Sequence, residues 1–180
     1  MQEEKAFIAA LLNDTTREAA FRQLVNQYGK PLYSHIRTIV VDHDDADDVL
    51  QNTFIKVFSN IAGFKGESKL FSWMYRIATN EAITFINQKA KKSGITNEEV
   101  LQRAVQNLRA DEYFEGDAIQ LKLQQAVASL PEKQQLVFKM RYFEDLKYEE
   151  ISEMLQTSVG ALKASYHHAV KKIEDYVNSH

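Results

Sequence analysis

Residues 148–173 read YEEISEMLQTSVGALKASYHHAVKKI. Apolar residues recur at helical spacing in the first eight positions and again from residue 159 onward, which predicts two amphipathic helices. Only residues 156–158 separate them, and Ser158 can cap the second helix. The predicted inward positions are Tyr148, Ile151, Leu155, Leu162, Tyr166, Ala169 and Ile173. A short joint followed by a helix with a free outer face is the arrangement of a DNA-binding helix-turn-helix.

The charge pattern separates the two helices of this pair. Residues 159–173 contain no acid, whereas residues 144–153 contain five acids. The cationic and titratable side chains of the second helix are Lys163, His167, His168, Lys171 and Lys172. A helix face without acids suits contact with DNA phosphates. The alternative interpretation is an ordinary helical hairpin with a solvated basic face.

The composition favours helices and excludes several kinds of site. The 180 residues include six glycines, two prolines and no cysteine, with 44% hydrophobic and 26% charged residues, which is typical of a globular protein. The lack of cysteine excludes disulfides and thiolate metal sites. His167 and His168 cannot chelate one ion, because successive helix positions point about 100° apart. We expect no metal, no cofactor and no enzymatic activity, since the sequence shows no Ser/His/Asp arrangement and no phosphate-binding glycine loop.

Helical periodicity also dominates the N-terminal half. Thr15-x-x-Glu18 has the pattern of a capping box. Gly29 followed by Pro31 predicts the end of one helix and the start of the next. The acid-rich residues 42–48 predict the start of a further helix, because acids interact favourably with the positive end of a helix dipole.

These features predict an all-α fold of two small helical domains joined by a flexible linker, with the helix-turn-helix in the C-terminal one. The N-terminal domain is expected at residues 1–92, where Ser68 is the predicted N-cap of a long helix. Residues 93–117 are the predicted linker, which is partly helical through a cap at Thr96. The C-terminal domain is expected at residues 118–180.

The net charge and the distribution of apolar residues indicate which partners and which cellular location to expect. The formal net charge of −3 argues against a stand-alone DNA binder, because phosphate contacts dominate DNA affinity. The N-terminus shows no basic-then-apolar leader, and no apolar run approaches the length of a membrane span. We therefore expect a cytoplasmic protein with no membrane insertion.

Three segments resemble a known family. Residues 130–138, LPEKQQLVF, together with residues 148–173, resemble the C-terminal domain of bacterial RNA polymerase sigma factors of the extracytoplasmic-function (ECF) type. Residues 45–58, DADDVLQNTFIKVF, resemble the family's segment that binds the polymerase clamp, and residues 64–80, FKGESKLFSWMYRIATN, its −10 recognition and melting segment. The resemblance implies a sigma factor that binds core RNA polymerase and promoter DNA and directs transcription initiation. It also implies an anti-sigma factor as a further partner.

The resemblance assigns polymerase contacts to the acid-rich helix. The implied residues are Asp45, Asp48, Gln51, Asn52 and Phe54. Acids and a flanking aromatic ring can form ion pairs and buried contacts with a basic partner helix. The alternative is that the acids only stabilise the start of their own helix.

The −10 assignment includes rings for unstacked bases and cations for phosphates. The implied residues are Phe64, Lys65, Lys69, Trp73, Tyr75, Arg76 and Asn80. Promoter melting takes bases out of the stack, so aromatic faces and hydrogen-bonding groups must receive them. For Trp73 the alternative is a place in the core.

The −35 assignment covers the second helix of the pair. The implied residues are Ser158, Lys163, Ser165, Tyr166, His167, His168 and Lys171. The family often carries two arginines where Ser165 and His168 stand, and arginine is the usual bidentate reader of guanine, so we expect weaker guanine readout. A different hypothesis is a stand-alone helix-turn-helix regulator whose N-terminal half is a sensor or dimerisation domain.

Overall fold

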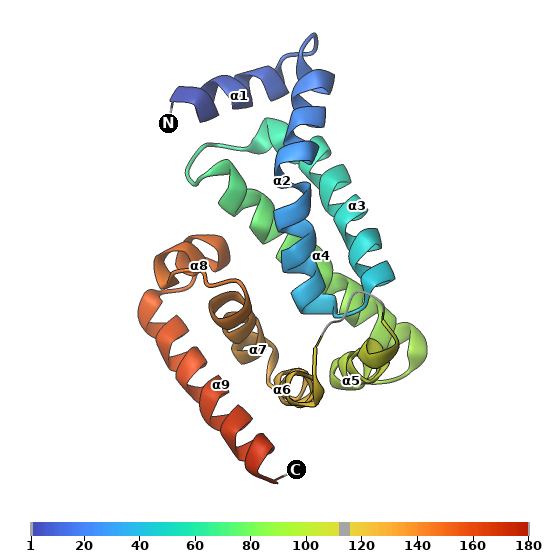
Figure 1. The fold of residues 1–180 in the computed structure, drawn as a ribbon. Helices are drawn as coiled ribbons and strands as arrows, with labels where there is room; N and C mark the ends of the chain where they lie inside the picture. The colour runs from blue at the N-terminus through green and yellow to red at the C-terminus, as the bar shows by residue number, and fades with distance from the viewer. Residues whose placement is uncertain (1, 112–115, 180) are drawn as a thin grey trace.

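The computed structural model describes residues 2–111 and 116–179, and over these residues the chain is helical, with no strand (Figure 1). The elements are α1 (Gln2–Leu12), α2 (Arg17–Val40), α3 (His43–Asn60), η1 (Ile61–Gly63), α4 (Leu70–Ser93), α5 (Asn97–Asn107), η2 (Leu108–Ala110), α6 (Ala118–Ala128), α7 (Glu132–Phe138), the π-helical turn η3 (Lys139–Phe143), α8 (Tyr148–Leu155) and α9 (Val159–Ser179). The all-α prediction is confirmed.

Helices α2, α3 and α4 pack side by side and form most of the N-terminal half (Figure 1). Their facing stripes supply fully buried residues such as Leu32, Ile36, Val49 and Met74. Asp42 begins α3 as predicted for the acidic segment, because its side chain accepts a hydrogen bond from the backbone N–H of Asp45 at 3.0 Å.

The predicted break at Gly29 and Pro31 is wrong, because α2 runs through both residues. A proline inside a helix removes one backbone hydrogen bond and crowds the preceding turn. The stripe that contains Leu24, Leu32 and Ile36 continues on both sides of it and is fully buried. Burial of that stripe outweighs the local cost, since tertiary packing supplies most of a helix's stability in a protein.

Two predicted helix caps are also wrong. Thr15 does not form a capping box; its backbone N–H and hydroxyl both donate to the Oδ1 atom of Asn13 instead, in a turn between α1 and α2. Ser68 is not the N-cap of α4, which begins after Lys69. At the first site the Asn13 side chain competes with the predicted cap. At the second, the N–H groups of Lys69 and Leu70 donate to the Oε1 atoms of Glu153 and Glu4, which no local pattern reveals.

The predicted linker segment contains a packed helix in its first part. Thr96 and Glu99 form the predicted capping box of α5, and Val100, Leu101 and Val105 are buried. Helix α5 lies against α4 and α6. Residues 112–115 of the predicted linker lie outside the described residues, and the division into two domains with a linker stays a prediction.

The C-terminal half places α9 across α6, α7 and α8. A second apolar cluster holds it together, with Val127, Phe138, Ala169 and Ile173 among its members. The predicted helix-turn-helix is present as α8 and α9. Gln156 adopts a left-handed conformation (φ 52°) at the end of α8, and the Ser158 hydroxyl accepts a hydrogen bond from the Ala161 N–H at 3.3 Å.

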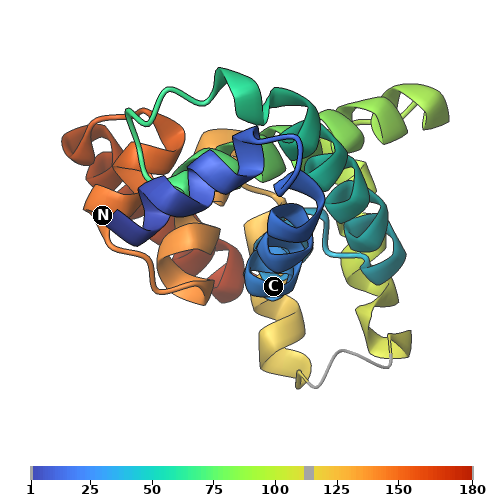
Figure 2. The ribbon, with the colours of Figure 1, turned by 90° about the horizontal axis from the view of Figure 1, so that it is seen from above.

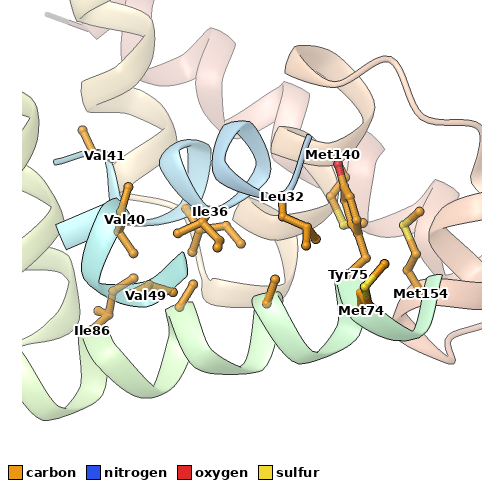
Figure 3. Packing of buried hydrophobic residues seen from close by; sticks show 14 of the residues in the cluster. Leu32, Ile36, Val40, Val41, Val49, Met74, Tyr75, Ile86, Met140 and Met154 are labelled. Atoms are coloured by element: carbon orange, nitrogen blue, oxygen red, sulfur yellow. The ribbon is translucent and has the colours of Figure 1, made fainter. Parts of the chain in front are cut away.

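The two halves lie directly against each other. Helix α8 packs on α4, and η3 packs on α2, an arrangement that can be followed in Figure 2. The main hydrophobic cluster accordingly contains Met74 and Tyr75 of α4 together with Met140 and Met154 of the C-terminal half (Figure 3). Residues more than sixty positions apart therefore share one core.

Candidate nucleic-acid interface

The outer face of α9 is cationic and exposed. Lys163, His167, His168 and Lys171 are all exposed, whereas Leu162, Ala169 and Ile173 on the opposite face are buried. Ser158 is exposed at the start of this helix and acts in its cap. The face therefore presents donors and positive charge without a carboxylate from residues 159–173, as a phosphate-binding surface requires.

Tyr166 does not belong to that exposed face. Its ring stacks on Phe138, with 5.7 Å between the ring centres, and meets Tyr148 edge-on at 6.3 Å. Burial raises the pKa of its hydroxyl above the ordinary value. The ring of Tyr166 therefore packs α9 against α7 and α8, and its contact with DNA stays a prediction. Ser165 is half-buried at the edge of the face.

A pocket of about 230 Å³ lies where the loop before α4 meets the first turns of that helix. Its lining residues are Gly63, Phe64, Lys65, Glu67, Ser68, Trp73 and Arg76. The rings of Phe64 and Trp73 are 5.2 Å apart and tilted by 52°. Both rings are half-buried, so each packs on the core and also borders the pocket.

The −10 residues on α4 share one side of the helix. Trp73, Arg76 and Asn80 are spaced three and four residues apart, which aligns them along the axis. Asn80 is exposed beyond the pocket, and Lys65 and Lys69 are exposed in and after the loop. The structure thus brings six of the seven predicted −10 residues to one region.

The seventh, Tyr75, faces the other way. It lies two positions after Trp73, which turns it about 200° around the helix. Its side chain is buried, its hydroxyl donates to the Oε2 atom of Glu144 at 2.7 Å, and its ring stacks on His35 with centres 4.2 Å apart. Burial, and secondarily the Glu144 carboxylate, raises the pKa of Tyr75. The predicted DNA contact is therefore corrected to a contact between the two halves.

Two of the residues on α3 that were predicted to contact polymerase interact with other residues of this chain. Phe54 is buried and meets Phe21 edge-on, with ring centres 6.2 Å apart. The Asp45 carboxylate is half-buried and forms an ion pair with Lys89 of α4. Burial raises the pKa of Asp45, although the Lys89 ammonium acts in the opposite direction. Phe54 is corrected to a core residue. Asp45 links α3 to α4 through its ion pair with Lys89, and its contact with polymerase stays a prediction.

The free face of α3 consists of Asp48, Gln51, Asn52 and Ile55. The first three are predicted contacts and are exposed. Ile55 is 63% exposed and was not among the predicted contacts. The signal was available, because Ile55 follows Asp48, Gln51 and Asn52 by seven, four and three residues and so lies on their side of the helix. An exposed isoleucine among polar groups is suited to the centre of a protein interface.

The described part of the chain lacks two other kinds of feature. No helix there is long and apolar enough to cross a membrane. No group of three or more His, Cys, Asp or Glu side chains within residues 2–111 and 116–179 is placed to hold a metal ion.

Comparison with known proteins identifies the family. Residues 24–92 match the family model for Sigma-70 region 2, and residues 120–173 match Sigma-70, region 4. The ECF RNA polymerase sigma-E factor of Haemophilus influenzae is 30% identical over 168 residues, which cover 88% of this chain and 87% of that protein. This chain is an ECF-type RNA polymerase sigma factor. The sigma factor SigW of Bacillus subtilis is 31% identical over 160 residues, covering 82% and 83%.

Solved structures agree on the fold of this sigma factor. CnrH, in complex with the cytosolic domain of CnrY, superposes with a TM-score of 0.67 at 18% identity, covering 98% of this chain and 97% of that one. The sigma factor RpoE of Bartonella quintana, in complex with the anti-sigma factor NepR, gives a TM-score of 0.62 at 17% identity, covering 88% and 96%.

The matched regions coincide with the surfaces described above. The region 2 match runs from within α2 to the end part of α4 and contains the α3 face and the pocket. The region 4 match runs from α6 to Ile173 and contains the face of α9. As a sigma factor, the protein binds core RNA polymerase and promoter DNA and directs transcription initiation, so the hypothesis of a stand-alone regulator is not favoured.

Proposed function

We propose that the surfaces of this sigma factor divide the work of initiation among three sites. The single observation that supports this division best is the placement of a ring-lined pocket and an acid-free helix face on the two segments that match sigma regions 2 and 4. The protein acts as a binding subunit in the cytoplasm, where RNA polymerase works, and performs no reaction itself.

The polymerase-binding site is the free face of α3. Asp48 supplies negative charge, Gln51 and Asn52 supply hydrogen bonds, and Ile55 supplies an apolar centre that water leaves on binding. These side chains already lie on one ordered helix, so little conformational entropy is lost when a basic partner helix docks.

The −10 site is the pocket at the start of α4. A base that leaves the stack can lie against Phe64 or Trp73, and base–aromatic stacking contributes about 1–3 kcal/mol. Lys65, Lys69 and Arg76 then neutralise neighbouring phosphates. Glu67 in the lining adds a hydrogen-bond acceptor for base edges.

The −35 site is the outer face of α9. Lys163 and Lys171 contact phosphates, and His167 and His168 reach the major groove. Neither histidine offers the rigid two-donor fork of arginine, so the site contributes less direct readout of guanine. The acidic net charge of −3 further weakens the free protein's affinity for DNA, and the polymerase supplies the remainder.

Control of this protein by an anti-sigma factor is part of the proposal. The structural relatives named above were solved with CnrY and with NepR bound. A partner of that kind would act on this chain by covering the surfaces that polymerase needs.

Run-off transcription tests the proposed function. Core RNA polymerase from the same bacterium is incubated with this protein on fragments of that genome, and transcripts are sequenced. We expect initiation at a set of promoters only when the protein is present, and a loss of at least about tenfold for the Asp48→Lys variant, since like charges replace an attractive pair. The control is Glu18→Lys, which changes the same charge at an exposed position of α2. Transcription that does not depend on the protein would contradict the proposal.

A further inference from the structure

The first turn of α4 is capped by side chains from other elements. Helix α4, all of which is described, begins without an acid in its first turn and without a side-chain hydrogen bond from its N-cap residue, Lys69. The backbone N–H of Leu70 donates instead to the Oε1 atom of Glu4 on α1 at 2.6 Å, and that of Lys69 to the Oε1 atom of Glu153 on α8 at 2.9 Å. Carboxylates at the positive end of a helix dipole form strong, charge-assisted hydrogen bonds. Of the two, Glu4 belongs to the same half of the molecule as the candidate −10 pocket.

Helix α1 holds the Glu4 carboxylate in place, because it is packed on the N-terminal half. Leu11 near its end is fully buried. Phe7 and Ile8 pack against the main hydrophobic cluster from partly buried positions. Since a packed helix carries the carboxylate, little conformational entropy opposes its bond to Leu70.

The same helix borders both ends of the loop that lines the pocket. It lies against η1, whose last residue, Gly63, is part of the pocket lining, and through Glu4 it reaches Leu70 at the start of α4. Figures 1 and 2 both show α1 beside this loop. The backbone N–H of Trp73 donates to the Lys69 carbonyl at 3.1 Å, so the turn that Glu4 caps also carries one ring of the pocket.

We propose that α1 is a functional part of the −10 site and that Glu4 is a positioning residue for promoter melting. The helix lies outside residues 24–92, which match Sigma-70 region 2. Glu4 acts through α4 and not by contact with DNA: it keeps the first turn formed, so that Trp73 receives an unstacked base without a prior cost of ordering. The inference rests on the proposed −10 role of the pocket, but the order of the pocket can be measured without DNA.

Trp73 reports on the pocket in the free protein, because it is the only tryptophan of the chain. The test compares Glu4→Ala with Glu3→Ala, which removes the same charge from an exposed position in the same turn of α1. For Glu4→Ala we expect hydrogen exchange at the Leu70 N–H to become about tenfold faster, the factor that loss of a hydrogen bond to a charged group produces. Acrylamide should also quench the fluorescence of Trp73 more strongly. Glu3→Ala should match the wild type in both measurements.

Promoter melting by the complex with core RNA polymerase is the second measurement, made at a temperature at which all variants are folded. Glu4→Ala should lower permanganate reactivity at −10 at least about threefold with unchanged DNase protection at −35, because a small displacement of an aligned group reduces function by that factor or more. A purely structural role of α1 would lower both signals together, through the folded fraction. Glu4→Gln keeps a side-chain oxygen that can accept from Leu70, so it should recover part of the reactivity.

The role of α1 is refuted if Glu4→Ala behaves like Glu3→Ala in quenching or in permanganate reactivity, or if the −10 and −35 signals fall together. Trp73→Ala separates this failure from a failure of the proposed function. If Trp73→Ala opens the promoter normally, the proposed −10 role of the pocket is wrong, whatever Glu4 does to the order of the pocket. If Trp73→Ala prevents melting while Glu4→Ala does not reduce it, only the role of α1 is wrong.

Discussion

At the scale of single residues, Gln156 shapes the turn between α8 and α9, and Lys139 lies at the contact between the two halves. Gln156 turns the chain between α8 and α9 in a left-handed conformation that favours glycine. Lys139 is almost fully buried, and its ammonium donates to the Ile39 carbonyl at 3.3 Å and the Gln135 Oε1 atom at 3.1 Å. Both residues carry local costs that the surrounding structure offsets.

Gln156→Gly should stabilise the protein. Glycine reaches φ 52° without a Cβ clash, which should add about 0.5–1 kcal/mol to the free energy of unfolding. Urea unfolding followed by circular dichroism measures it. Gln23→Gly, at an exposed position inside α2, is the matched control and should lose a similar amount. Equal losses in both variants would show that residue 156 is not strained.

Lys139 should make stability rise with pH. Burial lowers the pKa of its ammonium from 10.5 to about 7, so between these values the unfolded state binds more protons than the folded state. The free energy of unfolding then increases with pH, by on the order of 2 kcal/mol from pH 7 to pH 9. Lys139→Met should remove that slope. The check is urea unfolding at several pH values, and an unchanged slope in the variant would mean that other groups cause it.

The buried residue Tyr75 shows why the role of a side chain could not always be predicted from the sequence. Its partner Glu144 is 69 positions away along the chain, and no local sequence pattern predicts the hydrogen bond between them. Phe54 and Ile55 differ in this respect, since helical spacing alone places Ile55 on the side of Asp48 and Asn52. The omission of Ile55 was therefore avoidable. The burial of Tyr75 could be known only from the placement of the two halves.

At the scale of elements, a long buried apolar face outweighs local helix-breaking residues. The helix-turn-helix, the acidic start of α3 and the capping box of α5 follow from short-range rules and were predicted correctly. The break at Gly29 and Pro31 was predicted from equally valid local rules and did not occur, because α2 packs on α3 and α4 along its length. The starts of α3 and α5 are capped by neighbouring residues, whereas the free N–H groups at the start of α4 bond to Glu153 and Glu4, which are distant in the sequence. The continuity of α2 depends on the core.

Gly29→Ala should therefore stabilise α2. A Cβ at this position meets nothing within 4 Å, and alanine inside a helix is favoured over glycine by about 1 kcal/mol. Thermal or urea unfolding measures the gain. Gly94→Ala is the contrasting control: this residue ends α4 at φ 65°, so the variant should lose about 1 kcal/mol. A loss at residue 29 would indicate that the helix is interrupted there after all.

At the scale of the whole molecule, an acidic sigma factor carries two separate surfaces for which we propose contacts with DNA. The net charge of the chain is −3, yet residues 159–173 of α9 contain no acid. The acidic α8 lies beside the start of α4, where Glu153 accepts a hydrogen bond from the Lys69 N–H. The order of the surfaces could be inferred from sequence motifs. Their mutual placement could not, because it depends on the contact of Glu144 with α2 and α4.

Promoter footprinting of two variants in complex with core polymerase can separate a −10 role of α4 from a −35 role of α9. On a promoter identified by run-off transcription, permanganate detects unpaired thymines at −10, and DNase protection reports occupancy at −35. We predict that Trp73→Ala keeps −35 protection but loses permanganate reactivity about tenfold or more, because the stacking surface is gone. Lys171→Ala should instead weaken −35 protection, with reactivity at −10 restored at higher protein concentration. If Trp73→Ala melts the promoter normally, or if both variants lose both signals together, the division of work between α4 and α9 is wrong.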